Sequence, residues 1–437
     1  MSNLLLIKNG EIADSKYLKK ADILIKDGKI AKILESKEAG FCYQKTLGLG
    51  LEIAGARIID AGGLMVLPGF IDLHAHFRDP GYIHKEDLQT GQAAAAAGGF
   101  TTVCVMPNTK PVADSAEAIR YIIGKAGKTG LVNVLPVGAV TKGQNGRELA
   151  DIEEMRRAGA AALSEDGKSV GDERLMRAAL ELCARLDMPM LSHCEELSLV
   201  GGGVINEGEM AGKLRLSGIP NAAEDRIIAR DIVLARESGA RLHICHLSTK
   251  GGVALVRGAK AAGEAVTAEA APHHFTLCDR DIPGDDGNFK MNPPLRAPED
   301  RDAVKNALLD GTIDCVATDH APHSAEEKSG GFRKAANGII GLETAFALAY
   351  TELVRGEGMS LQGLAAVMSA NPARLLKLPK GEVREGFDAD LTIADLSAGY
   401  KIPGEFKSKS ANTPFVGREV FGRVKYTIRG GEIVYKN

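Results

Sequence analysis

The sequence reads GFIDLHAH at residues 69–76, an apolar run that begins at a glycine and ends on two histidines. Short, mostly apolar runs of this kind are typical of strands that are buried on both faces. Similar runs recur along the middle of the chain. We expect strands at residues 69–76, 101–106, 133–137, 160–164, 189–193, 241–246, 265–270 and 312–318.

Helical patterns separate these strands, for example at residues 172–186 and 224–238. Eight strands, each followed by a helix, over roughly 300 residues predict an α/β fold of the (β/α)8 TIM-barrel type. An open doubly wound sheet is the second interpretation. No G-x-G-x-x-G motif follows any of the strands, so the dinucleotide-binding form of that sheet has little support.

The two ends of the chain carry a different, strand-rich pattern. Residues 21–34 and 424–435 alternate around Asp-Gly and Gly-Gly turns, which predicts two β-hairpins, and residues 390–395 alternate as well. Neither end is long enough to close a domain alone. We therefore expect a small β-sandwich-like domain made from both ends of the chain, with the barrel between them: residues 1–66 and 376–437 for the β domain, and residues 67–375 for the barrel.

Composition narrows the class of function. The 437 residues carry 54 Lys and Arg against 57 Asp and Glu, with no Trp and 5% aromatic residues, so neither nucleic acid nor a membrane surface is an expected partner. The N-terminus does not read as a signal peptide, and no apolar run is long enough to cross a bilayer. The seven cysteines are scattered and never form C-x-x-C, which indicates a reducing compartment and a cytoplasmic protein.

All ten histidines fall between residues 74 and 323. Catalytic groups of TIM barrels come from the C-terminal ends of the strands, and six candidates occupy such ends. They are His74, His76, Asp166, His193, His246 and Asp319. The pair His74 and His76 shares one face of a strand, although alone such a pair is more often one packed and one solvated histidine. Together, four imidazoles and two carboxylates suit Zn²⁺, and six ligands favour two ions that share a bridge.

Longer motifs carry a family resemblance. The sequence reads GFIDLHAHFRDPG at 69–81, PNTKP at 107–111, SHCE at 192–195, CHLSTK at 245–250, APHHF at 271–275, KMNPPLR at 290–296 and ATDHAPH at 317–323. In these motifs, and from about residue 20 to the C-terminus, it resembles the bacterial type I dihydroorotases of the amidohydrolase superfamily.

The resemblance implies a ligand set for two zinc ions per chain. His74, His76 and Asp319 would hold one ion, His193 and His246 the other, and Asp166 and a hydroxide would bridge them. Hydantoinases and many relatives use a carboxylated lysine as the bridge. Lys168 and Glu165 are the neighbouring alternatives, but we expect Lys168 in an exposed loop, and the family's spacing to the histidine of the fifth strand selects Asp166.

The resemblance also implies contacts to the substrate. Arg78 offers a planar guanidinium suited to a carboxylate, although a surface ion pair is the commoner fate of an arginine. The full set that matches the family consists of His76, Arg78, Asn108, Asn292, His323, Asn337 and Gly338. The sequence departs from the family at Asn337, where an aromatic residue often precedes the glycine. It also has extra residues of unknown purpose at 41–56.

The activity implied by the resemblance is the reversible interconversion of (S)-dihydroorotate plus water and N-carbamoyl-L-aspartate in pyrimidine (UMP) biosynthesis. Hydroxide held by the metals would attack the ring carbonyl, and Asp319 would act as the general acid and base. The alternatives are a hydantoinase- or allantoinase-type cyclic amidohydrolase, and a non-catalytic subunit that scaffolds aspartate carbamoyltransferase. A homodimer and an association with that transcarbamoylase stay open.

Two further side chains are expected to turn away from the site. His243 lies three residues before His246, so strand alternation predicts that it packs against helices. Cys245 adjoins His246 and is expected, by the same alternation, to point elsewhere.

Overall fold

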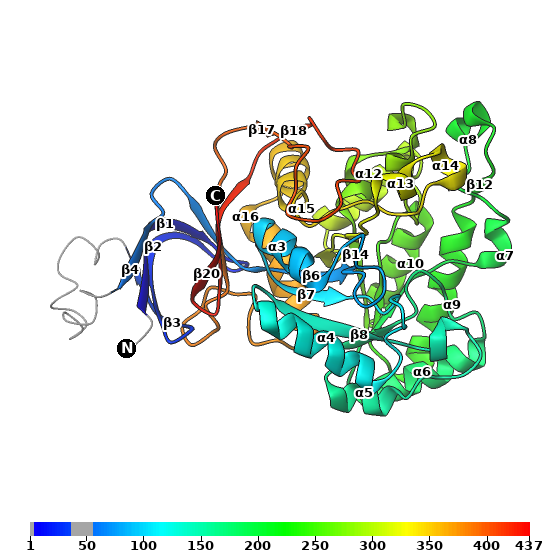
Figure 1. Ribbon diagram of the computed structural model, residues 1–437, viewed down its shortest axis with the longest axis horizontal. Helices are drawn as coiled ribbons and strands as arrows, with labels where there is room; N and C mark the ends of the chain where they lie inside the picture. The colour runs from blue at the N-terminus through cyan, green and yellow to red at the C-terminus, as the bar shows by residue number, and fades with distance from the viewer. Residues whose placement is uncertain (1–3, 36–55) are drawn as a thin grey trace.

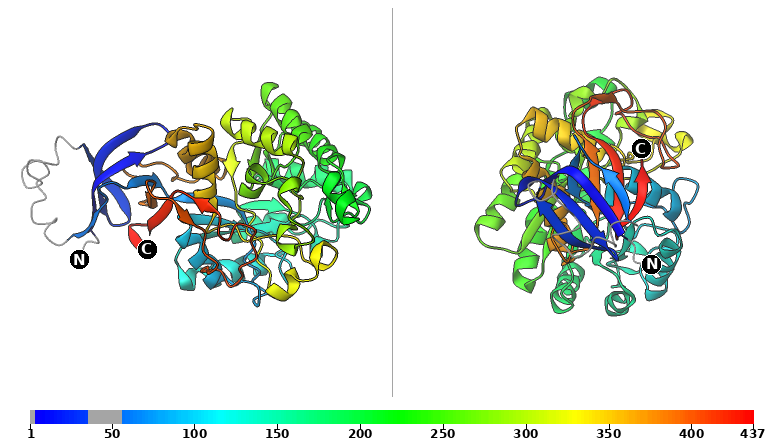
Figure 2. Two further views of the ribbon diagram at one scale, coloured as in Figure 1. Left: turned by 90° about the horizontal axis from the view of Figure 1, so that it is seen from above. Right: turned by 90° about the vertical axis from the view of Figure 1, so that its left-hand side faces the viewer.

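A computed structural model describes residues 4–35 and 56–437, and the extra residues predicted at 41–56 lie almost entirely outside these ranges. Figures 1 and 2 show a helix-covered barrel with a strand-rich body at one end. Within the described ranges, no helix combines the length and the apolar character that a membrane span requires.

Eight parallel strands form the barrel sheet, in the order β15-β14-β13-β10-β9-β8-β7-β6. A bridge between Ala75 and His320 joins its two edges. The eight predicted strands and the TIM-barrel fold are therefore confirmed. The strands are β6 (Phe70–Ala75), β7 (Phe100–Val105), β8 (Asn133–Ala139), β9 (Ala162–Ser164), β10 (Met190–Ser192), β13 (Leu242–Ile244), β14 (Val266–Ala270) and β15 (Cys315–Val316).

Helices cover the outside of the barrel, and α6 (Glu173–Arg185) shows why they form where predicted. Its N-cap Asp172 accepts hydrogen bonds from the first backbone N–H groups, and its buried face repeats at helical spacing, from Met176 to Cys183. The other helices of the outer layer are α3 (Leu88–Ala97), α4 (Ala116–Thr129), α5 (Ile152–Ala158), α9 (Ala222–Ser238), α10 (Lys250–Ala261), α12 (Pro298–Leu309), α15 (Ala345–Ala349), α16 (Leu361–Ala365) and α17 (Asn371–Leu375).

Shorter elements lie in the connections after the strands and in the C-terminal segment. They are α7 (Leu197–Val200), β11 (Ile205–Asn206), α8 (Glu209–Leu214), β12 (Gly218–Ile219), α11 (Pro272–Thr276), α13 (Ala325–Lys328), α14 (Gly331–Lys334), β17 (Tyr400–Lys401) and β18 (Glu419–Val420).

The two ends of the chain share a second eight-stranded sheet. Both predicted hairpins are present, as β2–β3 and β19–β20, and β5 joins the ends because it pairs with β1 on one side and β16 on the other. Isoleucines such as Ile7, Ile12 and Ile393 fill the core of this sheet. The exact domain boundaries stay a prediction. The strands are β1 (Leu4–Ala13), β2 (Leu18–Lys26), β3 (Lys29–Glu35), β4 (Arg57–Asp60), β5 (Met65–Pro68), β16 (Leu391–Asp395), β19 (Arg423–Arg429) and β20 (Glu432–Lys436).

Candidate active site

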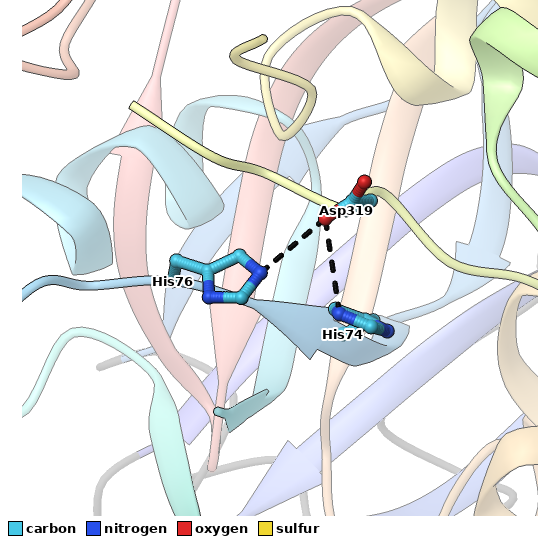
Figure 3. Close-up of side chains that lie close together, drawn as sticks. All are labelled: His74, His76 and Asp319. Carbon is cyan, nitrogen blue, oxygen red and sulfur yellow. Dashed lines mark ion pairs between the residues drawn. The ribbon is translucent and has the colours of Figure 1, made fainter. Parts of the chain in front are cut away.

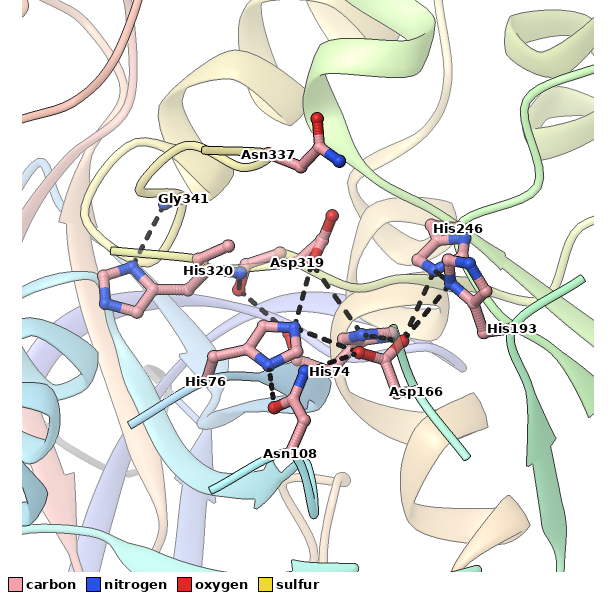
Figure 4. A network of polar contacts seen from close by, with 12 residues as sticks. His74, His76, Asn108, Asp166, His193, His246, Asp319, His320, Asn337 and Gly341 are labelled. Atoms are coloured by element: carbon pink, nitrogen blue, oxygen red, sulfur yellow. Dashed lines mark hydrogen bonds and ion pairs between the residues drawn. The ribbon is translucent and has the colours of Figure 1, made fainter. Parts of the chain in front are cut away.

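The six side chains predicted as metal ligands lie together at the C-terminal end of the barrel (Figure 4). All six are buried, and they come from the ends of β6, β9, β10, β13 and β15. They are His74, His76, Asp166, His193, His246 and Asp319. Parallel strands deliver their C-terminal ends to one rim of a barrel, so residues far apart in sequence meet there.

Asp166 lies between the two pairs of histidines. Its Oδ1 is 3.1 Å from His74 Nε2, and 3.5 and 3.6 Å from the nearest ring nitrogens of His193 and His246. Its Oδ2 is 3.4 Å from His76 Nε2. One carboxylate therefore faces all four imidazoles.

Asp319 lies just past the end of β15 and closes the cluster (Figure 3). Its Oδ1 is 3.3 Å from His76 Nε2 and 3.7 Å from His74 Nε2, while its second oxygen points toward Asn337 (Figure 4). Burial alone would raise the pKa of this carboxyl, but the hydrogen bond from His76 and the nearby imidazoles outweigh burial and hold the pKa below its usual range. Asp319 is thus ionised, as a ligand and proton acceptor must be.

Several polar atoms of the cluster are buried without a hydrogen-bond partner in the described part of the chain. They include His74 Nε2, Asp166 Oδ1 and His193 Nε2. Buried polar atoms in folded proteins are nearly always satisfied, so orphaned atoms that face one another call for a missing group. The metal-ligating atoms of His74, His76 and Asp319 all lie within 4.8 Å of one another. A second, overlapping group with the same spacing consists of His74, Asp166 and His246. Nitrogen and oxygen donors at this spacing fit a divalent metal ion.

Glu269, on β14, supports the cluster from inside the barrel. Its two oxygens lie 2.9 Å from His74 Nδ1 and 3.0 Å from His243 Nε2. Burial opposes its ionisation, but the hydrogen bonds and charges of the two histidines lower its pKa to about 2. The carboxylate therefore accepts and His74 Nδ1 donates, so Nε2 is the ring nitrogen that faces Asp166 and Asp319 and would bind a metal.

These contacts correct two predictions. His243 does not pack against helices, because both of its ring nitrogens contact side chains of β14, namely Thr267 and Glu269. Cys245 does not turn away either, since its Sγ lies within 4.8 Å of a ring nitrogen of His74 and a carboxylate oxygen of Glu269. The reason is that β13 ends at Ile244 and the backbone of His246 has a φ of 31°, so the two-residue alternation does not extend to His246.

We expect Glu269→Gln to weaken metal binding by roughly 10- to 100-fold, since an amide accepts only one of the two imidazole N–H bonds and loses the negative charge. The measurement is the metal content after dialysis against a graded series of chelator concentrations. Glu343→Gln is the control, because Glu343 is a half-buried glutamate whose hydrogen bonds come from the backbone N–H groups of Lys407 and Ser408. Equal metal retention in both variants would contradict this role for Glu269.

A cavity of about 220 Å³ opens above the cluster. The predicted substrate contacts line it: His76, Arg78, Asn108, Asn292, His323, Asn337 and Gly338. Asn108 also holds the cluster, because its Oδ1 lies 2.8 Å from His76 Nδ1 and its amide group donates to Asp166 Oδ2 at 3.4 Å. Asn292 donates to Glu195 at 3.0 Å.

Arg78 has no acidic partner: in residues 4–35 and 56–437, no carboxylate lies within ion-pair distance of its guanidinium. Burial lowers its pKa to about 10, so it remains charged. Its hydrogen-bond acceptor is the carbonyl of Pro322, 3.3 Å from Nε.

The neighbouring His323 cannot accept a hydrogen bond from the Arg78 guanidinium. Burial and the charges of Arg78, Lys85 and Lys328 lower the pKa of His323 to about 3, so its ring is neutral and carries one N–H. Nε2 lies 2.8 Å from the carbonyl of Asn337 and must donate to it, while Nδ1 accepts from Lys85 at 3.3 Å. The Arg78 nitrogen that is 3.2 Å from Nε2 therefore meets another donor, which leaves the guanidinium available to an anion in the cavity.

The two alternatives to Asp166 point elsewhere. Glu165 accepts hydrogen bonds from the backbone N–H groups of Val140 and Thr141, each at 3.0 Å. Lys168 donates to the carbonyl of Gln144 at 2.9 Å. Neither side chain contacts the four histidines, so Asp166 is the residue positioned between them.

A TIM barrel with histidines and aspartates gathered at its strand ends is the arrangement of a metal-dependent hydrolase. The family model described as "Dihydro-orotase-like" matches residues 63–252. Dihydroorotase of Staphylococcus epidermidis is 46% identical over 432 residues, which is 99% of each chain. Dihydroorotase of Halalkalibacterium halodurans is 47% identical over 433 residues, 99% of this chain and 98% of that one.

Among solved structures, the L-hydantoinase (dihydropyrimidinase) of Arthrobacter aurescens superposes with a TM-score of 0.88 at 28% identity, covering 100% of this chain and 96% of its own. The D-hydantoinase of a Thermus species gives 0.83 at 28% identity, with 98% and 94% covered. The chain belongs to the dihydroorotase family, whose members are hydrolases of cyclic amide bonds.

Proposed function

We propose that the protein is a dihydroorotase that interconverts (S)-dihydroorotate plus water and N-carbamoyl-L-aspartate in pyrimidine biosynthesis. The observation that carries this proposal is Arg78, whose guanidinium shares the cavity with the histidine and aspartate cluster and has no carboxylate partner among the described residues. Dihydroorotate combines the two features that this cavity addresses, a cyclic amide and a carboxylate. The test is the loss of dihydroorotate absorbance when the purified enzyme is added.

We further propose that the metal is zinc and that each chain holds two ions. His74, His76 and Asp319 would hold one, His193 and His246 the other, and Asp166 would bridge them. The position of Asp166 between all four imidazoles supports the bridge, and the orphaned buried atoms support the presence of metal. Bound zinc supplies Lewis-acid polarisation of a carbonyl and lowers the pKa of water toward neutrality.

The protein's own residues would then orient the ring and move the proton. Arg78 pairs with the substrate carboxylate, and Asn292 and the backbone at Asn337 and Gly338 line the space around the ring. Asp319 takes the proton of the attacking water and passes it to the ring nitrogen as the carbon–nitrogen bond breaks. The direction of its second oxygen toward Asn337, which also lines the cavity, supports this role. In reverse, the same groups close the ring.

Metal content separates this proposal from a non-catalytic subunit. We expect the purified protein to contain up to two zinc ions per chain, measured by elemental analysis. Chelation should abolish turnover of dihydroorotate, and added zinc should restore it. A metal-free protein with full activity would contradict the binuclear proposal.

A hydantoinase-type activity is the second candidate, and the structural similarity to hydantoinases is the observation that favours it. The position of Lys168, hydrogen-bonded to Gln144 away from the cluster, counts against a carboxylated-lysine bridge. Hydantoin and dihydroorotate offered in parallel distinguish the two activities. The cytoplasmic location, a homodimer and an association with aspartate carbamoyltransferase stay predictions, and size-exclusion chromatography with and without the transcarbamoylase tests the last two.

A further inference from the structure

The C-terminal segment between β17 and β18 leaves the end sheet and runs along the barrel (Figure 1). It is tied to the connection after β6 by several hydrogen bonds, including Ser410 Oγ to the carbonyl of Lys85 at 2.7 Å and Lys409 Nζ to the carbonyl of Ile83 at 2.8 Å. The segment continues to Asn412, which is buried and is hydrogen-bonded to residues that line the cavity.

The Asn412 side chain joins two stretches of that wall. Its Oδ1 accepts from the backbone N–H of His323 at 3.0 Å. Its amide group donates to the carbonyls of Ala321 at 3.2 Å and Gly338 at 3.0 Å, and its backbone carbonyl accepts from Ile340 at 2.9 Å. One carboxamide thus satisfies groups on both the 321–323 and the 338–340 stretches.

These two stretches, with Asn337 directly before the second, line part of the cavity. Ala321, His323, Asn337 and Gly338 all face the cavity. They are packed so closely that a Cβ added at Gly338 would come within 2.4 Å of the Ala321 Cβ, and the φ of Gly338 is 121°, which side-chain-bearing residues rarely adopt. The separation of the stretches is therefore tightly set, and Asn412 bonds to both sides of it.

Asn412 is also connected, through His323, to the surroundings of the Arg78 guanidinium. The backbone N–H held by Asn412 belongs to His323, whose ring bonds to Asn337 and leaves Arg78 available to an anion. We propose that Asn412 is a positioning residue for substrate recognition: it fixes His323 and Gly338 in the wall of the carboxylate-binding cavity, although it comes from the C-terminal segment. This inference rests on the proposed dihydroorotase function.

The test is a comparison of Asn412→Ala with Asn206→Ala. Asn206 is the matched control, because it is also a buried asparagine that uses both ends of its amide, toward Asp279 and Arg296, and it does not line the cavity. Both variants should lose thermal stability. Asn412→Ala is expected to raise KM for dihydroorotate by roughly 10- to 100-fold with kcat within about threefold of wild type and its zinc retained. Asn206→Ala should leave KM within about twofold.

A second readout does not depend on turnover. In protein with ¹⁵N-labelled histidine, the imidazole signals of His323, assigned by their loss in His323→Gln, should shift in Asn412→Ala and stay in place in Asn206→Ala. Asn412→Ser, which keeps one short hydrogen-bonding group, should give an intermediate KM and an intermediate shift, and it replaces the alanine variant if that one does not fold.

The outcomes separate the two proposals. A wild type that leaves dihydroorotate unchanged would overturn the proposed function, and the histidine signals would still decide whether Asn412 positions His323. Unchanged KM together with unchanged His323 signals would overturn the role of Asn412. So would a fall in kcat and zinc content that parallels the loss of stability.

Discussion

Asp319→Asn is expected to lower kcat for dihydroorotate by about 10²–10⁴-fold, the range that general acid–base catalysis contributes. The substitution keeps the shape of the side chain but removes its ability to accept and return a proton. It also replaces a carboxylate that faces His74 and His76 with a neutral amide. The barrel should stay folded and keep at least the ion assigned to His193 and His246. The measurements are kcat, zinc content and a thermal melt.

The matched control for this variant is Asp300→Asn. Asp300 is a buried aspartate on α12 that accepts hydrogen bonds from Asn221 and Lys250, outside the cavity. Its variant should lose stability and keep its turnover. An Asp319→Asn enzyme within tenfold of wild type would remove Asp319 from the proton-transfer role.

Arg78→Met is expected to raise KM for dihydroorotate steeply while zinc stays bound. Losing a charge-assisted contact to a carboxylate costs about 2–5 kcal/mol, which is roughly 30- to 5,000-fold in kcat/KM. Methionine keeps part of the apolar length of the side chain and removes the guanidinium. Arg78→Lys keeps the positive charge but lacks the planar pair of donors, so its KM for dihydroorotate should lie between those of wild type and Arg78→Met.

Substrate comparison is the sharper part of this experiment. Dihydrouracil lacks the carboxylate, so wild type should open it poorly, and Arg78→Met should change that low rate little. Equal turnover of dihydrouracil or hydantoin and dihydroorotate by wild type would show that the cavity does not select a carboxylate. The hydantoinase-type activity would then be the better proposal.

The sequence was sufficient for the barrel and for the residues that gather at its rim, because strand ends in a parallel barrel converge whatever their distance along the chain. The His74 and His76 pair shows this well, since His74 lies on β6 and His76 directly follows that strand. Strand alternation failed at His243 and Cys245 because it was counted back from His246, which lies beyond the last regular residue of β13.

Backbone strain marks the same region. Arg78, His246 and Asp319 have φ values of 59°, 31° and 45°, which residues with side chains seldom adopt. No periodic pattern in a sequence indicates which residues adopt such φ values, so the directions in which the neighbouring side chains point could not be predicted. The sequence contained one signal for Glu269, because it is the only charged residue in the strand VTAEA. Asn412 left none, because its partners lie in other segments that only the fold brings near.

The end sheet has a consequence for how the protein is made. β5 is followed directly along the chain by β6, the first strand of the barrel. Its partner β16, however, is synthesised only after all eight barrel strands. A growing chain on the ribosome can therefore assemble barrel strands while one edge of β5 stays unpaired, and the sheet closes only when the C-terminal part emerges. Pairings between such distant segments form slowly. Emergence of the strands that follow the barrel, rather than completion of the barrel itself, thus completes the end sheet.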